Sequence, residues 1–335
     1  MVIEAAPHRV LVINVSRIGD TLLCTPALRA LARHWPQARI DFLGHPKRHE
    51  IVAHLPFVAS SGPIEKNRAR LKGWLGGKRW DLALVYGFDK PLVRYALRAA
   101  ARVVAFRQGE PGLDARLHRA VEKPPFQSMH AVDYQLLLPQ ALGAPPAGKR
   151  LAYAVTAEER AWAKAFLAGA VRGGAKPLVG LQVASFPTKA FRDWPLESFV
   201  ELCRRIAARW AGAHFLFLGG ETEAEKIRGA AGTLGGLATV VAGTLPLRRS
   251  IALMNELDLY VGVDTGPTHI MGALDAPMVA LYHCHSPSHL LMPLERHGLH
   301  VVDHPRAGRD KSEDAPMSEI PVEAVWRQVV SALAR

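Results

Sequence analysis

The sequence LYVGVDTGPTHIMGAL, residues 259–274, decides the fold class. It opens with an apolar run at residues 259–263, turns through residues 264–267 and continues into a helical pattern at residues 269–274. A short, uninterrupted apolar run is typical of a strand buried in a parallel sheet. Amides at a helix start lack intrahelical acceptors, and the helix dipole favours anions there. The stretch therefore predicts a strand–turn–helix unit with an anion site at the turn.

Strands and helices alternate on both sides of this stretch. Apolar runs predict strands at residues 10–15, 39–43, 81–86, 102–106, 178–183, 213–218, 238–241 and 277–282. Helices are expected at residues 21–34 (with a kink at Pro26), 91–100, 128–142, 195–210, 221–231, 247–257 and 322–334. Two such arrays in succession predict an α/β protein with two doubly wound, Rossmann-like domains facing each other across a cleft.

The boundary between the arrays is marked by the segment GAPPAGK at residues 143–149. Clusters of Pro and Gly of this kind are typical of interdomain linkers. We therefore expect one domain over residues 1–145, a second over residues 150–320, and a closing helix within residues 321–335. A chain of 335 residues is also long enough for two domains of ordinary size.

Positive charge is concentrated in the first half. Residues 1–150 carry 23 Lys and Arg against 11 Asp and Glu, an excess of 12, whereas residues 151–335 carry 19 of each. This asymmetry suggests a polyanionic partner, which is nucleic acid, an anionic membrane or an acidic substrate; the alternative is a charge that serves solubility alone. Nucleic acid is disfavoured because no helix-turn-helix, zinc-finger or RNA-binding signature is present.

Cysteine usage and hydropathy argue against a disulfide-rich, a membrane-spanning and a secreted protein. The three cysteines, Cys24, Cys203 and Cys284, are far apart and odd in number, which argues against a disulfide framework and for a reducing compartment. No apolar run approaches the ~18 residues that span a bilayer. Residues 1–9 have no apolar signal core, so we expect a cytoplasmic protein.

Three loops at strand ends carry unusual chemistry. The first, SRIGD at residues 16–20, has a single glycine and so does not fit a dinucleotide site. Asp20 fits two compatible roles: N-cap of the next helix, or a carboxylate that takes a proton from a hydroxyl. In the second loop, residues 184–195, Lys189 and Arg192 suit a pyrophosphate, the alternative being a solvated surface loop. The third is the turn at Gly266, where His269 either faces a phosphate or is structural.

These loops, in this order, resemble the lipopolysaccharide heptosyltransferases of glycosyltransferase family 9. The motifs that carry the resemblance are SRIGDTL at residues 16–22 with TPAL at 25–28, Trp194-Pro195 with Phe199, Gly219-Gly220 followed by Glu223, and DTGPTH at residues 264–269. The likeness extends from about residue 9 to about residue 283.

The resemblance implies a GT-B fold, with the acceptor on the first domain and a nucleotide sugar, ADP-heptose, on the second. It implies transfer with inversion and without a metal or other cofactor. By the match, Asp20 is the general base, and the amides of Thr265 and Gly266 hold the pyrophosphate with His269 nearby. Asp264 faces the donor sugar or phosphates, and Glu223, or alternatively Glu221, binds the ribose.

The sequence departs from the family pattern in two places. The family has Lys two residues before its Trp-Pro pair, where this chain has Arg192. Lys189 lies three residues before Arg192, and one of these two cations is expected to contact the diphosphate. After the strand at residues 277–282 this chain has HCHSPSH, residues 283–289, instead of a Gly-Pro-Thr type of loop. These side chains are either metal ligands or, more simply, a polar lining of the donor cleft.

The acceptor is expected to bind Arg17 and the basic segment at residues 66–80, the alternative for this segment being a solvated loop. The segment holds six cations, among them Lys66, Arg68, Arg70 and Lys72, interleaved with two Trp, which suits an anionic glycolipid at the inner face of the inner membrane. The expected function is transfer of heptose to a lipopolysaccharide core (lipid A–inner core) acceptor. Alternatives are a transferase of another nucleotide sugar, a sugar-nucleotide isomerase, or a non-catalytic binding protein of this fold.

Overall fold

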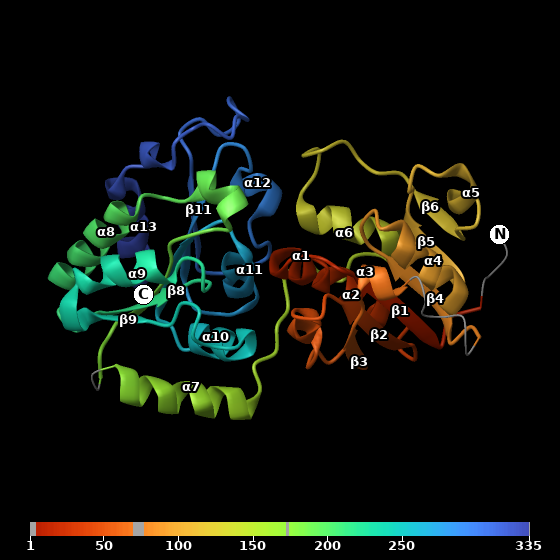
Figure 1. Ribbon diagram of the computed structural model, residues 1–335, viewed down its shortest axis with the longest axis horizontal. Coiled ribbons are helices and arrows are strands. Elements are labelled where there is room, and N and C mark those ends of the chain that lie inside the picture. Colours follow the sequence, from red (N-terminus) through yellow and green to blue (C-terminus); the bar gives the residue numbers. More distant parts are fainter. Residues whose placement is uncertain (1–4, 70–76, 172–173, 335) are drawn as a thin grey trace. The chain divides into compact units, whose positions relative to one another are not determined.

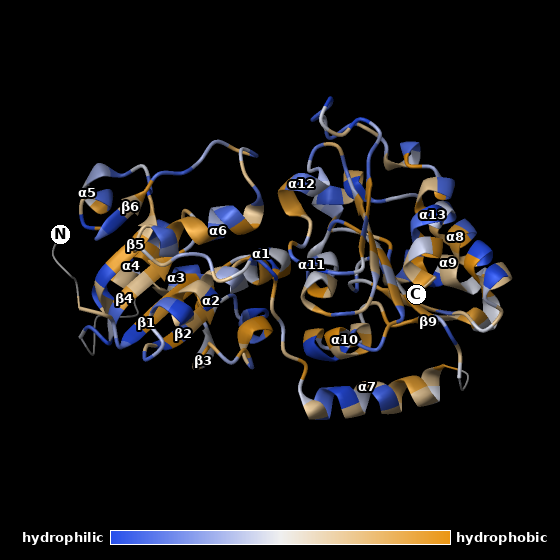
Figure 2. Cartoon of the chain, turned by 180° about the vertical axis from the view of Figure 1, so that it is seen from behind, coloured by the Kyte–Doolittle hydropathy of each residue, from blue (hydrophilic) through white to orange (hydrophobic). Residues whose placement is uncertain are grey.

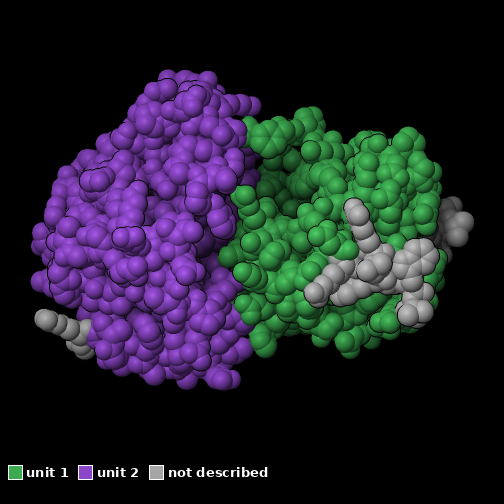
Figure 3. Space-filling view, viewed as in Figure 1, with its two compact units in different colours: residues 1–154 green, residues 155–335 purple. Residues whose placement is uncertain are grey.

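The chain divides into two compact units, Met1–Ala154 and Val155–Arg335 (Figure 1; Figure 3). The computed structural model describes residues 5–69, 77–171 and 174–334. The division falls after the Gly/Pro segment, because residues 150–152 are still tied to unit 1. Arg29 Nη2 donates to the Arg150 carbonyl at 2.8 Å, and the Ala152 amide donates to Thr25 Oγ1 at 2.9 Å.

Unit 1 contains a parallel sheet of six strands in the order β3-β2-β1-β4-β5-β6. The strands are β1 (Arg9–Asn14), β2 (Arg39–Gly44), β3 (Ser60–Pro63), β4 (Trp80–Val85), β5 (Ala100–Phe106) and β6 (Arg119–Val121). In the register, Val10 of β1 lies opposite Ile40 of β2 and Leu82 of β4. The order reverses between β1 and β4, which makes this pair the switch point of the sheet.

The helices of unit 1 alternate with its strands, and the first of them begins at Ile18, before the predicted start at residue 21. They are α1 (Ile18–Leu23), α2 (Thr25–His34), η1 (His49–Val52), α3 (Lys66–Ala69), α4 (Lys90–Ala99), α5 (Pro111–Asp114) and α6 (Ala131–Gln140). The single kinked helix expected over residues 21–34 is wrong, because Cys24 separates α1 from α2. Pro26 lies in the first turn of α2, where the missing amide costs no hydrogen bond.

Unit 2 repeats the architecture with the strand order β12-β11-β10-β7-β8-β9, all parallel. The strands are β7 (Leu178–Gln182), β8 (His214–Leu218), β9 (Ala238–Val240), β10 (Leu259–Val263), β11 (Met278–Tyr282) and β12 (Leu299–Asp303). The helices are α7 (Ala157–Ala170), η2 (Pro187–Arg192), α8 (Leu196–Arg209), α9 (Ala224–Gly232), η3 (Gly235–Leu237), α10 (Leu247–Met254), α11 (Gly266–Ala273), α12 (Ser288–Leu291), η4 (Met317–Glu319) and α13 (Val322–Leu333). The order reverses between β7 and β10.

The central strands form the core of each unit. Every residue of β7, β8, β10 and β11 is buried, and amphipathic helices such as α8 and α13 cover the sheet with their apolar sides (Figure 2). Trp194, only 1% exposed, donates from Nε1 to the Ile320 carbonyl at 2.9 Å and so joins the loop before α8 to the approach to α13. The three cysteines are free and buried. No helix in the described parts of the chain combines the length and hydrophobicity that crossing a bilayer requires.

Candidate active site

Both switch points carry loops that the sequence singled out. In unit 1 the loop after β1 leads into α1 with Arg17 and Asp20. In unit 2 the loops after β7 and β10 carry Arg192 and Asp264. Open parallel sheets bind ligands beyond the carboxyl ends of the strands at the point where the strand order reverses. The fold therefore provides one candidate site in each unit.

Asp20 presents an exposed side chain in the first turn of α1. The N-cap of this helix is Arg17, so the expected capping role of Asp20 is wrong: its charge still suits the positive helix end, three residues into the turn. Asn14 Nδ2 donates to the Asp20 carbonyl at 3.4 Å, which ties the helix start to the end of β1. The carboxylate is thus accessible at a fixed place beside the switch point.

Two cations, Arg17 and Arg48, belong to the surroundings of Asp20, and the sequence had pointed only to Arg17. Arg48 Nη1 donates to the Ser16 carbonyl at 3.0 Å, within the loop that leads to Asp20. Burial lowers the pKa of the Arg48 guanidinium; the charge of Arg17 lowers this pKa further, whereas the charge of Asp20 raises it. Arg48 follows β2, the neighbour of β1, so adjacency of the two strand ends was the signal that could have identified it.

The other cations that the sequence analysis assigns to the acceptor lie in or next to the segment around α3. Lys66 is half-exposed and its Nζ lies 2.8 Å from Asp89 Oδ1. Arg68 belongs to α3, and its side chain is not described. Arg70 and Lys72 lie outside the described residues. Of the cations expected to bind the acceptor, Arg17 is the N-cap of α1, the helix whose first turn carries Asp20.

In unit 2, Arg192 and Asp264 form a buried ion pair across the switch point. Arg192 Nη1 lies 2.9 Å from Asp264 Oδ2, and the two side chains are 20% and 3% exposed. Arg192 Nη2 donates to Ser286 Oγ at 3.2 Å, and His269 Nε2 lies 3.6 Å from Asp264 Oδ1. The loops after β7, β10 and β11, which are neighbours in the sheet, therefore converge on one charged cluster.

Lys189 lies on the same 3-10 turn but has a different partner. Its Nζ is 3.0 Å from Glu313 Oε1, and both side chains are partly exposed. Lys189 Nζ and the Arg192 guanidinium lie 5.1 and 5.5 Å from the centre of the Phe191 ring. The two candidate phosphate ligands are thus neighbours with separate carboxylates.

The turn after β10 starts α11 three residues earlier than expected, at Gly266. Thr268 secures this start: its Oγ1 donates to the Val263 carbonyl at 2.6 Å and lies 2.9 Å from the Tyr260 hydroxyl. Tyr260 can reach it only because residue 262 is glycine, since a Cβ there would lie 2.4 Å from the Tyr260 oxygen. The Thr265–Gly266 amides are therefore presented at a rigid helix start, as anion binding requires.

Glu223, the expected ribose ligand, stands at the N-cap of α9 in the turn after β8. Its carboxylate accepts the Gly220 amide at 3.1 Å and the Thr222 hydroxyl at 2.5 Å. Burial raises the pKa of Asp193, and the charge of Glu223 raises it further, which places this turn close to the loop after β7. The alternative residue, Glu221, is exposed.

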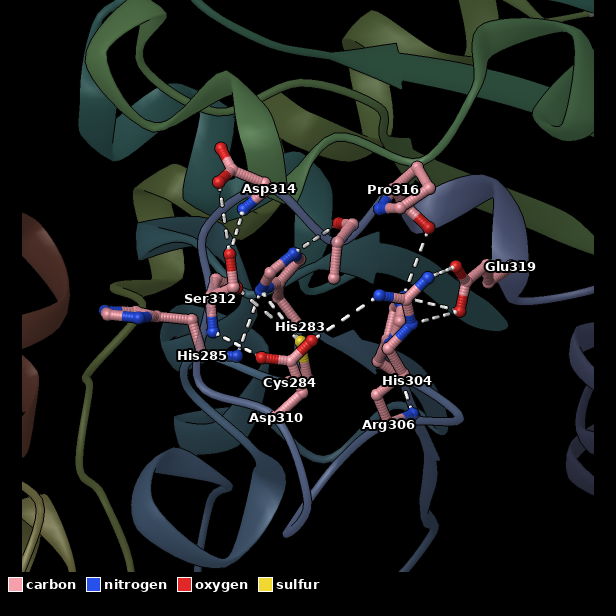
Figure 4. Close-up of polar contacts among 11 residues, drawn as sticks. His283, Cys284, His285, His304, Arg306, Asp310, Ser312, Asp314, Pro316 and Glu319 are labelled. Atoms are coloured by element: carbon pink, nitrogen blue, oxygen red, sulfur yellow. Dashed lines mark hydrogen bonds and ion pairs between the residues drawn. The ribbon is translucent and has the colours of Figure 1, made fainter.

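His283 and His285, which follow β11, hold the backbone of neighbouring segments through hydrogen bonds (Figure 4). Within the described residues, no three His, Cys, Asp or Glu side chains are grouped as metal ligands would be. His283 Nδ1 accepts the His285 amide at 3.0 Å, so its proton is on Nε2, which donates to the Ala315 carbonyl at 2.7 Å. His304, after β12, repeats the arrangement with the Arg306 amide and the Pro316 carbonyl. Both ring nitrogens of each histidine are thus used, and the segment at residues 311–316 is held against the site.

The two hydrogen bonds of the buried His283 ring predict a loss of stability in acid. Burial lowers the pKa of His283 from its ordinary value near 6.5, so the unfolded chain takes up a proton at a higher pH than the folded protein does. The stabilisation is complete above pH 6.5 and is lost as the pH falls through the lower folded pKa. Urea unfolding of His283→Gln should show a smaller loss of unfolding free energy between pH 7.5 and 5.5 than wild type. The exposed-histidine control His297→Gln should match wild type, and equal losses in all three proteins would contradict the prediction.

Two parallel six-stranded sheets, each with a reversal of strand order, define a GT-B glycosyltransferase fold. Known structures of similar fold support this assignment. The structure of E. coli ADP-heptose lps heptosyltransferase II is similar with a TM-score of 0.81 at 20% identity, over 97% of this chain and 98% of that one. The family profile of Glycosyltransferase family 9 (heptosyltransferase) matches residues 70–320. The chain belongs to this family and is a glycosyltransferase.

Two curated relatives cover most of the chain. The lipopolysaccharide core heptosyltransferase OpsX of Haemophilus influenzae is 21% identical over 294 residues, which is 84% of this chain and 81% of the relative. Lipopolysaccharide heptosyltransferase 1 of Pseudomonas aeruginosa is 28% identical over 303 residues, 82% of this chain and 78% of the relative. Both relatives are named for heptose transfer to lipopolysaccharide.

Proposed function

We propose that this glycosyltransferase moves heptose from ADP-heptose to a lipopolysaccharide core (lipid A–inner core) acceptor, with inversion and without a metal ion. The observation that carries the proposal is the pair of switch-point sites. One has an exposed carboxylate with cations nearby, and the other has a charged cluster at a helix start. The names of the family and of the relatives support the choice of heptose and of the acceptor.

On the acceptor side, Asp20 is the general base. It takes the proton of the acceptor hydroxyl while that oxygen attacks the anomeric carbon from the face opposite the diphosphate. Arg17 and Arg48, which belong to the surroundings of Asp20, bind anionic groups of the acceptor core and so orient the hydroxyl. The carboxylate acts only in the transition state, so its main effect is on kcat.

On the donor side, fixed positive groups stabilise the leaving diphosphate. Negative charge develops on the diphosphate as the glycosidic bond breaks, and the amides of Thr265 and Gly266 with the α11 dipole offset it. Arg192 and Lys189 supply the cationic charge. Asp264, with His269 beside it, orients Arg192 and the sugar, and Glu223, or alternatively Glu221, accepts the ribose hydroxyls.

A donor panel tests the assignment. Thermal shift with ADP, UDP and GDP should show selective stabilisation by ADP, about 2.7 kcal/mol at a concentration of 100 Kd. Release of ADP from ADP-heptose should then require the acceptor. Consumption of the sugar nucleotide without acceptor would instead indicate an isomerase, and ADP binding with no turnover would indicate a non-catalytic binding protein.

We also propose that the enzyme is cytoplasmic and works peripherally at the inner face of the inner membrane, where the cations Lys66, Arg68, Arg70 and Lys72 contact the anionic glycolipid. Neutralising all four should raise the acceptor KM roughly tenfold or more, since each cation near an anionic surface contributes on the order of 1 kcal/mol, with little change in kcat. A matched control neutralises four exposed cations of unit 2: Lys164, Arg204, Arg209 and Arg228. An unchanged acceptor KM would remove this surface from the proposal.

A further inference from the structure

The two cations of the donor loop differ in how firmly they are held. The Arg192–Asp264 pair is buried, whereas in the Lys189–Glu313 pair the side chains are 32% and 47% exposed. Breaking a buried pair leaves an uncompensated charge away from water, but separating an exposed pair costs little because water replaces the partner. Lys189 can therefore change partners on ligand binding, and Arg192 stays with Asp264.

The exposed pair lies where a ligand can reach it. Glu313 and Phe191 both line an open hollow of about 250 Å³ beside the donor loop. The charges of Lys189, His285 and Arg192 all lower the pKa of Glu313, with the Lys189 hydrogen bond as the largest cause. Glu313 thus lies in the field of both phosphate-binding candidates, at the edge of the buried cluster.

Glu313 is also held in position by its own segment. The Lys311 carbonyl accepts from His285 Nδ1 at 2.8 Å, and the Ala315 carbonyl accepts from His283 Nε2 at 2.7 Å. These two bonds anchor the backbone on either side of Glu313. Its carboxylate therefore occupies a defined position beside Lys189, and an anion that binds Lys189 must compete with it.

We propose that Glu313 holds Lys189 in the donor-free enzyme and that the donor's diphosphate takes Lys189 from it, so that this exchange sets the donor affinity. The inference rests on the proposed donor site and assigns Glu313 a role that opposes binding. Lys189 is a diphosphate ligand in this scheme, and Arg192 keeps its place in the buried cluster. Because it competes for Lys189, the Glu313 carboxylate makes donor binding weaker than the cations alone would make it. The same competition weakens binding of the product ADP and so favours its release.

The test is a double-mutant cycle on ADP affinity, measured by calorimetry with the full-length protein. Glu313→Gln should tighten ADP binding roughly two- to five-fold, the range for an exposed ion pair. Lys189→Met should weaken it roughly tenfold, as loss of a charged hydrogen bond does. In the Lys189→Met background, Glu313→Gln should have a much smaller effect, because the cation that Glu313 holds is gone and only its weaker interactions with Arg192 and His285 remain. Adenosine, which lacks phosphates, should bind all variants equally.

Matched controls separate the exchange from general charge effects. Asp314→Asn and Lys311→Met alter exposed charges on the same segment and should leave ADP affinity unchanged. The proposal is overturned if Glu313→Gln fails to tighten ADP binding, if it tightens binding equally with Met at position 189, or if Asp314→Asn has the same effect. Failure of wild type to bind ADP while binding another nucleotide would overturn the proposed donor, and the same cycle with that nucleotide then decides the role of Glu313.

Discussion

Asp20→Asn should lower kcat by a factor of roughly 10²–10⁴, the usual contribution of a general base, with ADP affinity unchanged. Asparagine keeps the size of the side chain but cannot accept the acceptor proton. Because the side chain is exposed on α1, the substitution removes no buried contact and the fold should be kept. Steady-state transfer rates and ADP calorimetry on the same preparation measure the two effects separately.

A control substitution removes an equal charge elsewhere in unit 1. Glu122, which follows β6, is exposed and forms an ion pair with Arg107, which follows β5. The Glu122→Gln protein should therefore transfer heptose at the wild-type rate. Near wild-type turnover by a folded Asp20→Asn protein that still binds ADP would contradict the assignment of Asp20. A large rise in acceptor KM with an unchanged kcat would show that Asp20 only binds the acceptor.

Arg192→Met should destabilise unit 2 by about 3 kcal/mol and weaken ADP binding at least tenfold. The substitution removes the guanidinium opposite Asp264, whose carboxylate is 3% exposed, while the 20% exposure of Arg192 keeps the cost at the lower end for buried pairs. Chemical unfolding and ADP calorimetry measure the two consequences.

Adding the substitution Asp264→Asn to Arg192→Met separates the effect on protein stability from the effect on ADP binding. In Arg192→Met/Asp264→Asn the buried charge is gone, so the stability should recover while ADP binding stays weak. Arg205→Met, which removes the exposed ion pairs with Glu201 and Glu323, should change neither property appreciably. A double variant that is no more stable than Arg192→Met alone would show that the pair does not act as described.

The parts of the fold that could be predicted from sequence are those whose residues are buried on both sides. β1 and β10 appear as continuous apolar runs because helices cover both faces of their sheets. The edge strands β3, with the sequence SSGP, and β6, with RAV, are partly exposed and carry no such run. Helix α7 buries only Ala163, so its apolar pattern is too weak to recognise. The capping box of Thr156 and Glu159 is the signal that could have located its start.

The candidate site could be predicted by residue type but not by pairing. Arg192 and Asp264 were both named, yet they are 72 positions apart and meet because β7 and β10 are neighbours, a strand order that periodicity does not reveal. The choice between Lys189 and Arg192 depends on burial, which their spacing does not determine. Arg48 was missed for the same reason, since only the pairing of β1 with β2 brings it to Asp20.

The bond from Trp194 to the Ile320 carbonyl has a consequence for how the protein is made. Val325 and Val329 of α13 belong to the core of unit 2, so this core cannot close until α13 has been synthesised. All strands of unit 1, by contrast, are complete at residue 121. Domains generally fold as units during synthesis, with the N-terminal one first. Unit 1 can therefore begin to fold on the ribosome while unit 2 is still incomplete, whereas unit 2 cannot complete its core before α13 has emerged.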